Sequence, residues 1–122
     1  MPSSKVLATA LAQAAADKKG EDVLVLRLGR KNPVSDYIVI VSALSRPHLE
    51  TLENTLEDTA ESLGFAVLHK TRPRSDHWRI IDFGKILVHV MTPETREFYA
   101  LEKLHHDAAH VAWDKAAAEE GA

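Results

Sequence analysis

Apolar residues recur at intervals of three and four in two stretches of this chain, and this spacing predicts two amphipathic helices. The first helix should span residues 4–19 and bury Leu7, Leu11 and Ala14. The second should follow residue 45 and carry a stripe of leucines that ends before residue 64. Suitable capping residues flank both helices: Ser3, Ser4 and Gly20 for the first, and Ser45, Pro47 and Gly64 for the second.

Runs of branched apolar residues predict about five strands, at residues 21–28, 37–41, 65–69, 78–83 and 85–91. Residues 37–41 are apolar throughout, which is typical of a central strand, and Gly84 predicts a hairpin between the last two strands. A third helix should run from residue 94 to about 106, and it can continue through the alanine-rich tail to residue 118. This order predicts an α/β fold with a single mixed sheet of about five strands packed with helices.

Length and composition are those of one soluble domain. The 122 residues can form one core but not two, so we expect a domain at residues 1–107, with residues 108–122 as an alanine-rich extension of the last helix or a disordered tail. The 15 basic and 18 acidic side chains provide no overall positive charge for binding nucleic acid. No apolar run approaches the roughly 20 residues of a membrane helix and no secretory signal is visible, so we expect a cytoplasmic protein outside the membrane.

Motifs that could support catalysis or metal binding fail on their context. The sequence has no cysteine, which excludes disulfides, thiol nucleophiles and cysteine metal sites. Residues 82–84 read Asp-Phe-Gly, as in protein kinases, but no glycine-rich loop accompanies them. His106 and His110 would lie one turn apart on a helix, as zinc ligands do, but a solvated helix face explains this spacing better. We therefore expect no enzyme activity, no cofactor and no metal.

A basic segment at residues 70–79 offers a local site for RNA. Lys70, Arg72 and Arg74 could neutralise phosphates, and Trp78 could stack on a base. The alternative is an exposed loop in which Trp78 packs at the edge of the sheet. Both interpretations remain open at this point.

Polar and aromatic residues in the last third of the chain indicate a surface for recognition. His89 lies between two valines, where it is either a core histidine with a polar partner or a binding residue. If Asp82 faced His89 across the hairpin, the two side chains would satisfy each other. Phe98 and Tyr99 are adjacent and point about 100° apart on a helix, so at least one of them should be partly exposed. Tyrosine is a favoured anchor in protein interfaces.

Four segments, in this order, carry a resemblance to a known family. They are Lys-Gly-Glu-Asp-Val at residues 19–23, Val-Ser-Asp-Tyr-Ile-Val-Ile at 34–40, Ser-Arg-Pro-His at 45–48, and the whole of residues 78–104. With this order and spacing, residues 4–107 resemble the ribosomal silencing factor family, also called Iojap or RsfS.

The resemblance implies a non-enzymatic role on the ribosome. Members of the family bind the large ribosomal subunit through ribosomal protein fourteen of that subunit, block association with the small subunit and so repress translation. Their fold is similar to that of nucleotidyltransferases without the catalytic carboxylates, and they are commonly dimeric, which implies that this chain can form a homodimer. The alternatives are an RNA-binding ribosome assembly factor, with auxiliary rRNA contacts through Lys70, Arg72 and Arg74, and a nucleotidyltransferase-like enzyme.

The family's strongest motif maps the partner-binding residues onto the segment at residues 78–104. The resemblance implies apolar contacts and polar groups that set orientation, at Trp78, Asp82, His89, Phe98, Tyr99, Glu102 and Leu104. Two departures affect the details. The segment before Trp78 is basic here, and His105 stands where the family usually has a tryptophan. Trp113 could take that place only if the last helix continued and folded back.

Overall fold

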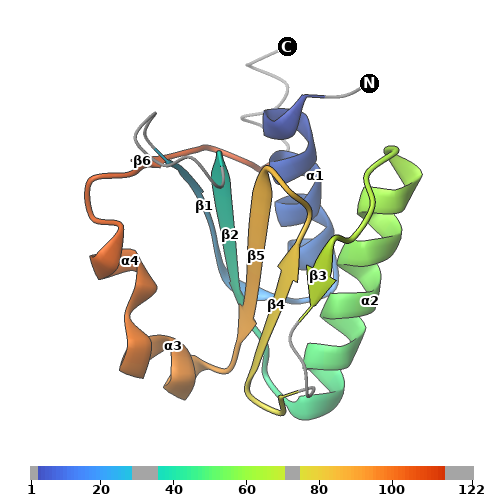
Figure 1. Ribbon diagram of the computed structural model, residues 1–122. Coiled ribbons are helices and arrows are strands. Elements are labelled where there is room, and N and C mark those ends of the chain that lie inside the picture. The colour runs from blue at the N-terminus through green and yellow to red at the C-terminus, as the bar shows by residue number, and fades with distance from the viewer. Residues whose placement is uncertain (1–2, 29–35, 71–74, 115–122) are drawn as a thin grey trace.

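A computed structural model describes residues 3–28, 36–70 and 75–114, and within these residues the chain forms four helices and six strands (Figure 1). The elements follow in the order α1 (Ser4–Asp17), β1 (Glu21–Arg27), β2 (Tyr37–Ser42), α2 (Arg46–Ser62), β3 (His69–Lys70), β4 (Trp78–Asp82), β5 (Ile86–Met91), α3 (Pro93–Tyr99), α4 (Leu101–Leu104) and β6 (Ala109–His110).

The strands form one mixed sheet in the order β3-β4-β5-β2-β1-β6. β2 and β5 are parallel, and every other pair of neighbours is antiparallel. All six residues of β2 are buried, which confirms the prediction of a central strand. The hairpin between β4 and β5 is also confirmed, with Gly84 at φ 94° in its turn, a backbone conformation that favours glycine. The predicted fold class, a single mixed sheet packed with helices, is therefore correct.

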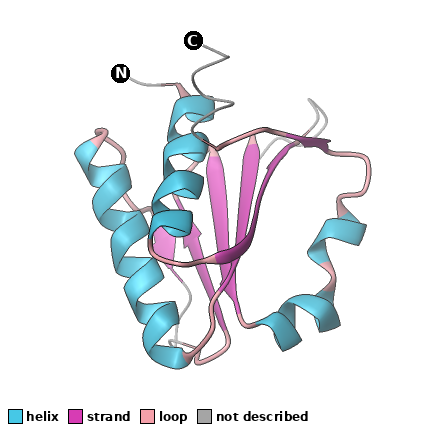
Figure 2. Cartoon of the chain, turned by 180° about the vertical axis from the view of Figure 1, so that it is seen from behind, coloured by secondary structure: helices cyan, strands magenta, loops and turns pink. Residues whose placement is uncertain are grey.

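The two faces of the sheet are covered unequally (Figures 1 and 2). α1 and α2 lie together on one face and supply the main core, because the apolar stripe of each helix turns toward the strands. The opposite face carries a smaller buried cluster of Leu26, Ile38, Ile40 and Met91. Its helical cover consists of the short α3 and α4, in which no residue is buried. One face of the sheet is therefore thinly covered.

The predicted N-caps of the first two helices are present, but the predicted C-cap of the first is wrong, because α1 ends at Asp17 with Lys18 as its C-cap in place of Gly20. Ser3 accepts a hydrogen bond from the backbone N–H of Val6, and Ser45 accepts one from that of His48. The His48 ring joins the two helices, since its Nδ1 accepts from the N–H of Leu44 at 2.8 Å and its Nε2 lies 2.8 Å from the carbonyl of Lys18. Because Nδ1 accepts a hydrogen bond, Nε2 carries the ring proton and donates a hydrogen bond to the carbonyl of Lys18. The Ser-Arg-Pro-His segment thus starts α2 and ties it to the end of α1.

The prediction for the third helix is wrong in two respects. The helix breaks at Ala100, which has a left-handed backbone (φ 47°, ψ 53°), and α4 follows as one short turn. Beyond α4 the described residues 105–114 contain no helix, and β6 pairs with the outer edge of β1. The N–H of Val111 donates to the carbonyl of Val25 at 2.8 Å. Unsatisfied backbone groups at a sheet edge favour such pairing over the helical preference of the alanines. Residues 115–118 lie outside the described residues.

The third strand is shorter than predicted. Only His69 and Lys70 form β3, although the N–H of Leu68 also donates to the carbonyl of Asp82 at 2.7 Å. Residues 65–68 do not form a strand, and Phe65 and Val67 pack against the main core.

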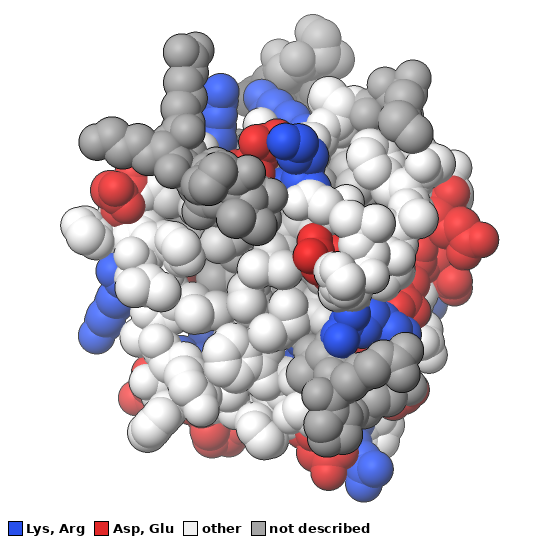
Figure 3. Space-filling view, viewed as in Figure 1, with Lys and Arg blue, Asp and Glu red and all other residues white. Residues whose placement is uncertain are grey.

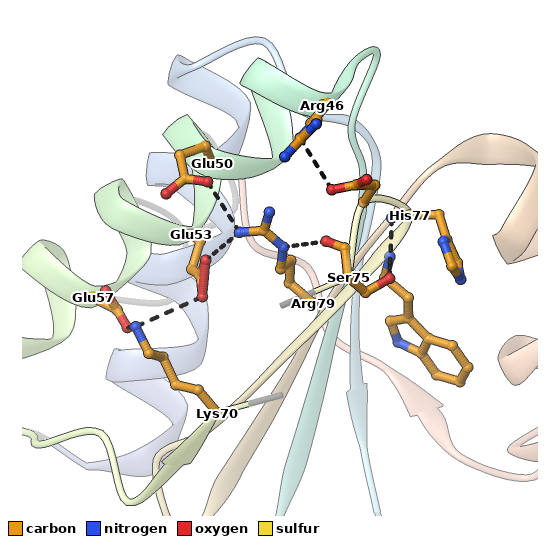
Figure 4. A network of polar contacts seen from close by, with 10 residues as sticks. Arg46, Glu50, Glu53, Glu57, Lys70, Ser75, His77 and Arg79 are labelled. Atoms are coloured by element: carbon orange, nitrogen blue, oxygen red, sulfur yellow. Dashed lines mark hydrogen bonds and ion pairs between the residues drawn. The ribbon is translucent and has the colours of Figure 1, made fainter. Parts of the chain in front are cut away.

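A polar network connects α2 to the strands β3 and β4 (Figure 4). The guanidinium of Arg79 and the carboxylate of Glu53 are only 3% and 2% exposed, and Arg79 Nη1 donates to Glu53 Oε1 at 2.7 Å. Arg79 also contacts Glu50 at 3.3 Å and donates from Nε to the carbonyl of Ser75. The hydroxyl of Ser75 accepts hydrogen bonds from the backbone N–H groups of His77 and Trp78. The network therefore fixes the start of β4.

Replacing one member of the buried pair should destabilise the fold strongly. Arg79→Met removes the guanidinium 2.7 Å from the buried Glu53 carboxylate, and we expect the free energy of unfolding to fall by about 3–5 kcal/mol. Urea titration measures this change. Arg46→Ala is the control, because Arg46 pairs with Asp76 at an exposed site and should cost less than about 1 kcal/mol. Equal effects of the two substitutions would contradict the prediction.

Candidate functional site

Trp78, His89, Phe98 and Tyr99 form an aromatic cluster on the thinly covered face of the sheet. Trp78 Nε1 donates to His89 Nδ1 at 3.0 Å, and the Trp78 and Tyr99 rings lie 4.6 Å apart between centroids. The Phe98 ring meets that of Tyr99 edge-on at 5.0 Å. Such separations and tilted orientations are favourable for aromatic pairs. The structure thus brings four of the seven candidate residues into one cluster.

Strand alternation and register place this cluster. Trp78 pairs with Met91 in the ladder, so His89 is its diagonal neighbour two residues along β5. Arg79 and Ile81 point to the opposite face, toward α2 and the main core. α3 begins directly after β5, with Thr92 as its N-cap, and it brings the ring of Tyr99 into contact with that of Trp78. Two adjacent strands and the helix that follows them therefore build the site.

The helices beside the cluster expose large apolar side chains. Phe98 is 81% exposed, Tyr99 52% and Leu104 70%, and these are three of the six exposed large apolar residues in the described chain. Figure 3 shows a mainly uncharged surface in the region that α3 occupies in Figure 1. The prediction that at least one of Phe98 and Tyr99 is exposed is confirmed, and both are. Large apolar side chains exposed side by side, as Phe98 and Tyr99 are, are typical of a protein interaction site.

Asp82 does not face His89, so the hypothesis of a pair across the hairpin is wrong. The register places Asp82 opposite Leu87 and His89 opposite Ile80. The Asp82 carboxylate instead accepts the N–H of Gly84 at 2.8 Å, which closes the hairpin turn. His89 obtains its polar partner from the indole of Trp78.

Glu102 is bound within the molecule, to Arg96. The Arg96 Nε donates to Glu102 Oε1, and Arg96 Nη1 donates to the hydroxyl of Ser42 at 3.0 Å. Partial burial alone would raise the pKa of Glu102, but the hydrogen bonds and the positive charge of Arg96 hold it below its ordinary value. An open hollow of about 400 Å³ lies beside this bridge, lined by Asp22, Val23, Leu24, Arg96 and Glu102. Sequence reasoning missed the bridge because a spacing of six residues does not join two side chains on one helix.

Trp113 does not fold back toward position 105. Its indole donates to the carbonyl of Val23 at 3.1 Å, and its own carbonyl accepts from Gln13 at 2.9 Å. Trp113 also packs against the main core beneath α1 and α2. It therefore fastens the C-terminal segment to the domain, and the hypothesis that it folds back toward the last helix is wrong.

The basic segment is partly neutralised within the domain. Lys70 Nζ lies 2.8 Å from the carboxylate of Glu57 and 3.8 Å from that of Glu53. Arg72 and Arg74, the other two cations predicted to contact rRNA, lie outside the described residues. Lys70 is thus held in ion pairs by α2, so its ammonium group is less available to bind a phosphate.

The pair of histidines considered for zinc is not on one helix. His106 lies in a turn and His110 on β6. Among the described residues no group of three or more histidines and carboxylates is arranged to hold a metal ion. In the same part of the chain no helix is long and apolar enough to cross a membrane.

Comparison with known proteins identifies the family. The model of the family "Ribosomal silencing factor during starvation" (RsfS) matches residues 1–122. The chain belongs to this family. It is 32% identical to the ribosomal silencing factor RsfS of Bacillus subtilis over 97 residues, and these residues cover 80% of this chain and 82% of that protein. This membership was predicted from the residues at 78–104 and the three shorter segments.

Longer relatives share the same domain. The chloroplastic protein Iojap of Zea mays is 30% identical over 105 residues, which cover 85% of this chain but 45% of that protein. A mouse protein named "Mitochondrial assembly of ribosomal large subunit protein 1" is 32% identical over 90 residues, with 71% of this chain and 40% of that protein covered. The chain thus spans less than half the length of these organellar relatives.

A solved structure from Bacillus halodurans has the same fold. Its TM-score is 0.72 at 27% sequence identity, and the match covers 88% of this chain and 98% of that one. The sheet and its helices are therefore a shared feature of the family.

His89 should make this domain less stable as the pH falls. Burial lowers the pKa of His89 from 6.5 to about 4, and the charge of His105 adds to this effect. Above pH 6.5 both the folded and the unfolded chain carry a neutral His89. Between pH 6.5 and about 4 only the unfolded chain binds this proton, so the free energy of unfolding should fall, by about 3 kcal/mol at most.

Urea titrations between about pH 7 and 4 test the role of His89 in this decline. His89→Gln removes the titrating group, keeps an acceptor for Trp78, and should flatten the decline. His77→Gln is the control, since His77 is exposed and its substitution should leave the decline unchanged. The same slope in His89→Gln and in the unmodified chain would contradict the assignment.

Proposed function

We propose that this chain is a non-enzymatic ribosomal silencing factor that docks on the large ribosomal subunit. Through ribosomal protein fourteen of that subunit it blocks association with the small subunit and represses translation in the cytoplasm. Family membership supports the general role. The name of the mouse relative, which refers to assembly of the large subunit, supports that subunit as the partner.

The observation that carries the proposal is the exposure of Phe98 and Tyr99 within the aromatic cluster and of Leu104 on the following helix. Exposed aromatic and aliphatic side chains gain free energy when a partner removes them from water. The hydrogen bond from Trp78 to His89 and the packing of Tyr99 on Trp78 hold the rings before the partner arrives. A pre-organised apolar surface of this kind favours binding to a protein partner.

The candidate residues divide between direct and indirect roles in this proposal. Phe98, Tyr99 and Leu104 would contact the partner, with the partly buried Trp78 at the base of the contact. His89 is only 7% exposed and would act by orienting Trp78. Asp82 would shape the hairpin turn. Glu102 would act through Arg96.

Loss of a ring from the aromatic cluster should weaken binding to large subunits. Tyr99→Ala and Trp78→Ala should each raise the Kd for isolated large subunits about thirtyfold, equivalent to about 2 kcal/mol. Sedimentation with purified subunits measures the Kd, and thermal melting checks that each variant is folded. Leu68→Ala is the matched control, because Leu68 is also an exposed apolar residue but lies beside β3. If Tyr99→Ala binds as well as Leu68→Ala, the proposed surface is wrong.

Salt dependence separates docking on a protein from docking on RNA. The aromatic cluster is uncharged and Lys70 is paired with Glu57, so the Kd should change less than about fivefold between about 50 and 200 mM salt. Binding through many phosphate contacts would weaken about a thousandfold or more over that range. A steep salt dependence that shrinks in Arg72→Gln with Arg74→Gln would favour the RNA-binding assembly factor. Sedimentation of the free chain in the same buffers tests the homodimer that the family resemblance implies.

A further inference from the structure

The segment that carries the exposed rings, residues 93–104, has little anchorage of its own, and we refer to it as the arm. α3 and α4 contain seven and four residues, and none of them is buried. Helices this short are marginal in water without tertiary contacts. Contacts with the sheet must therefore determine where the arm lies.

Apolar contacts of the arm with the sheet are few. Leu101 packs against the small cluster on the thinly covered face, and Tyr99 packs on Trp78. Phe98 and Leu104 are directed largely to solvent. These contacts hold two points of the arm and do not by themselves set the angle between α3 and α4.

Arg96 connects the three elements whose positions define the arm. From α3 it donates to the hydroxyl of Ser42 at the end of β2 and to the carboxylate of Glu102 in α4. The side chain of Arg96 is 12% exposed and that of Glu102 is 32% exposed, so water and salt reach the bridge only in part. Its three members are separated by up to 60 positions in the sequence, from 42 to 102.

The bridge spans a strained point of the backbone. Ala100 lies between Arg96 and Glu102 and adopts a left-handed conformation, which costs free energy for a residue with a Cβ atom. This break turns α4 back so that Glu102 reaches Arg96. The bridge therefore offsets the strain of the break that it spans.

We propose that Arg96 is a positioning residue for the docking surface, which it holds in the arrangement that the partner binds. This inference rests on the proposed function. Without the bridge the arm would sample other positions, and the partner would have to select the competent one. The apparent affinity falls in proportion to the population of that conformation.

Hydrogen exchange of the folded chain tests the bridge independently of the ribosome. In Arg96→Gln and in Glu102→Gln the amides of residues 93–104 should exchange about tenfold faster, while those of β2 and β5 remain unchanged. Lys103→Gln is the matched control, because Lys103 lies in α4 and is exposed. Combining Arg96→Glu with Glu102→Arg should restore much of the protection of the arm.

Binding to purified large subunits tests the positioning role. Arg96→Gln should raise the Kd about tenfold with little change in melting temperature, and the charge-reversed pair should recover most of this loss. If amides of the arm exchange equally fast in Arg96→Gln and in Lys103→Gln, the claim that the bridge holds the arm is overturned. If the arm loosens but the Kd stays the same, the positioning role is overturned. If the unmodified chain does not bind large subunits, the proposed function fails, and the exchange data still judge the bridge.

Discussion

The parallel pairing of β2 with β5 is the constraint on which the rest of this structure depends. It aligns six residue pairs, from Tyr37 with Ile86 to Ser42 with Met91, so both strands end at the same edge of the sheet. The chain leaves β5 beside the end of β2, and α3 begins at that point. Arg96 can therefore reach Ser42. The same strand β5 pairs with β4 on its other side and brings His89 to Trp78.

Two ion pairs, one buried and one partly exposed, lie on the two faces of the sheet. The pair of Arg79 with Glu53 is buried under α2, where the loss of one partner would leave a charge away from water. The pair of Arg96 with Glu102 is partly exposed and contributes less to the stability of the whole domain. Its effect is local, because it joins a short arm to the sheet. The first pair secures the start of β4, which carries Trp78, and the second secures the arm that carries Tyr99.

Three residues that the sequence analysis singled out, Lys70, Trp113 and His105, acquire structural roles. The basic residue Lys70 pairs with the acidic face of α2. Trp113 holds the C-terminal segment against the main core, while β6 covers the edge of β1. His105 lies near His89 and contributes to the lowered pKa of that residue. These three residues thus contribute to how the domain is held together.

Local patterns in the sequence were sufficient to predict the N-caps of the first two helices, the central strand, the hairpin at Gly84 and the family. Each of these depends on residues close together in the chain or on the period of apolar side chains, which is visible without knowledge of the fold. The sequence also indicated that Phe98 or Tyr99 would be exposed, because adjacent helix positions diverge.

Only the tertiary structure decided the break at Ala100, the strand β6, the partner of His89 and the bridge from Arg96 to Glu102 and Ser42. Alanine-rich residues favour a helix locally, but the open edge of β1 offers backbone hydrogen bonds that only the folded sheet provides. Asp82 and His89 looked suitable as a pair by composition, but in the folded hairpin the Asp82 carboxylate accepts from the N–H of Gly84 and His89 accepts from the indole of Trp78. Contacts between distant residues depend on how the elements pack, and packing is a property of the whole chain.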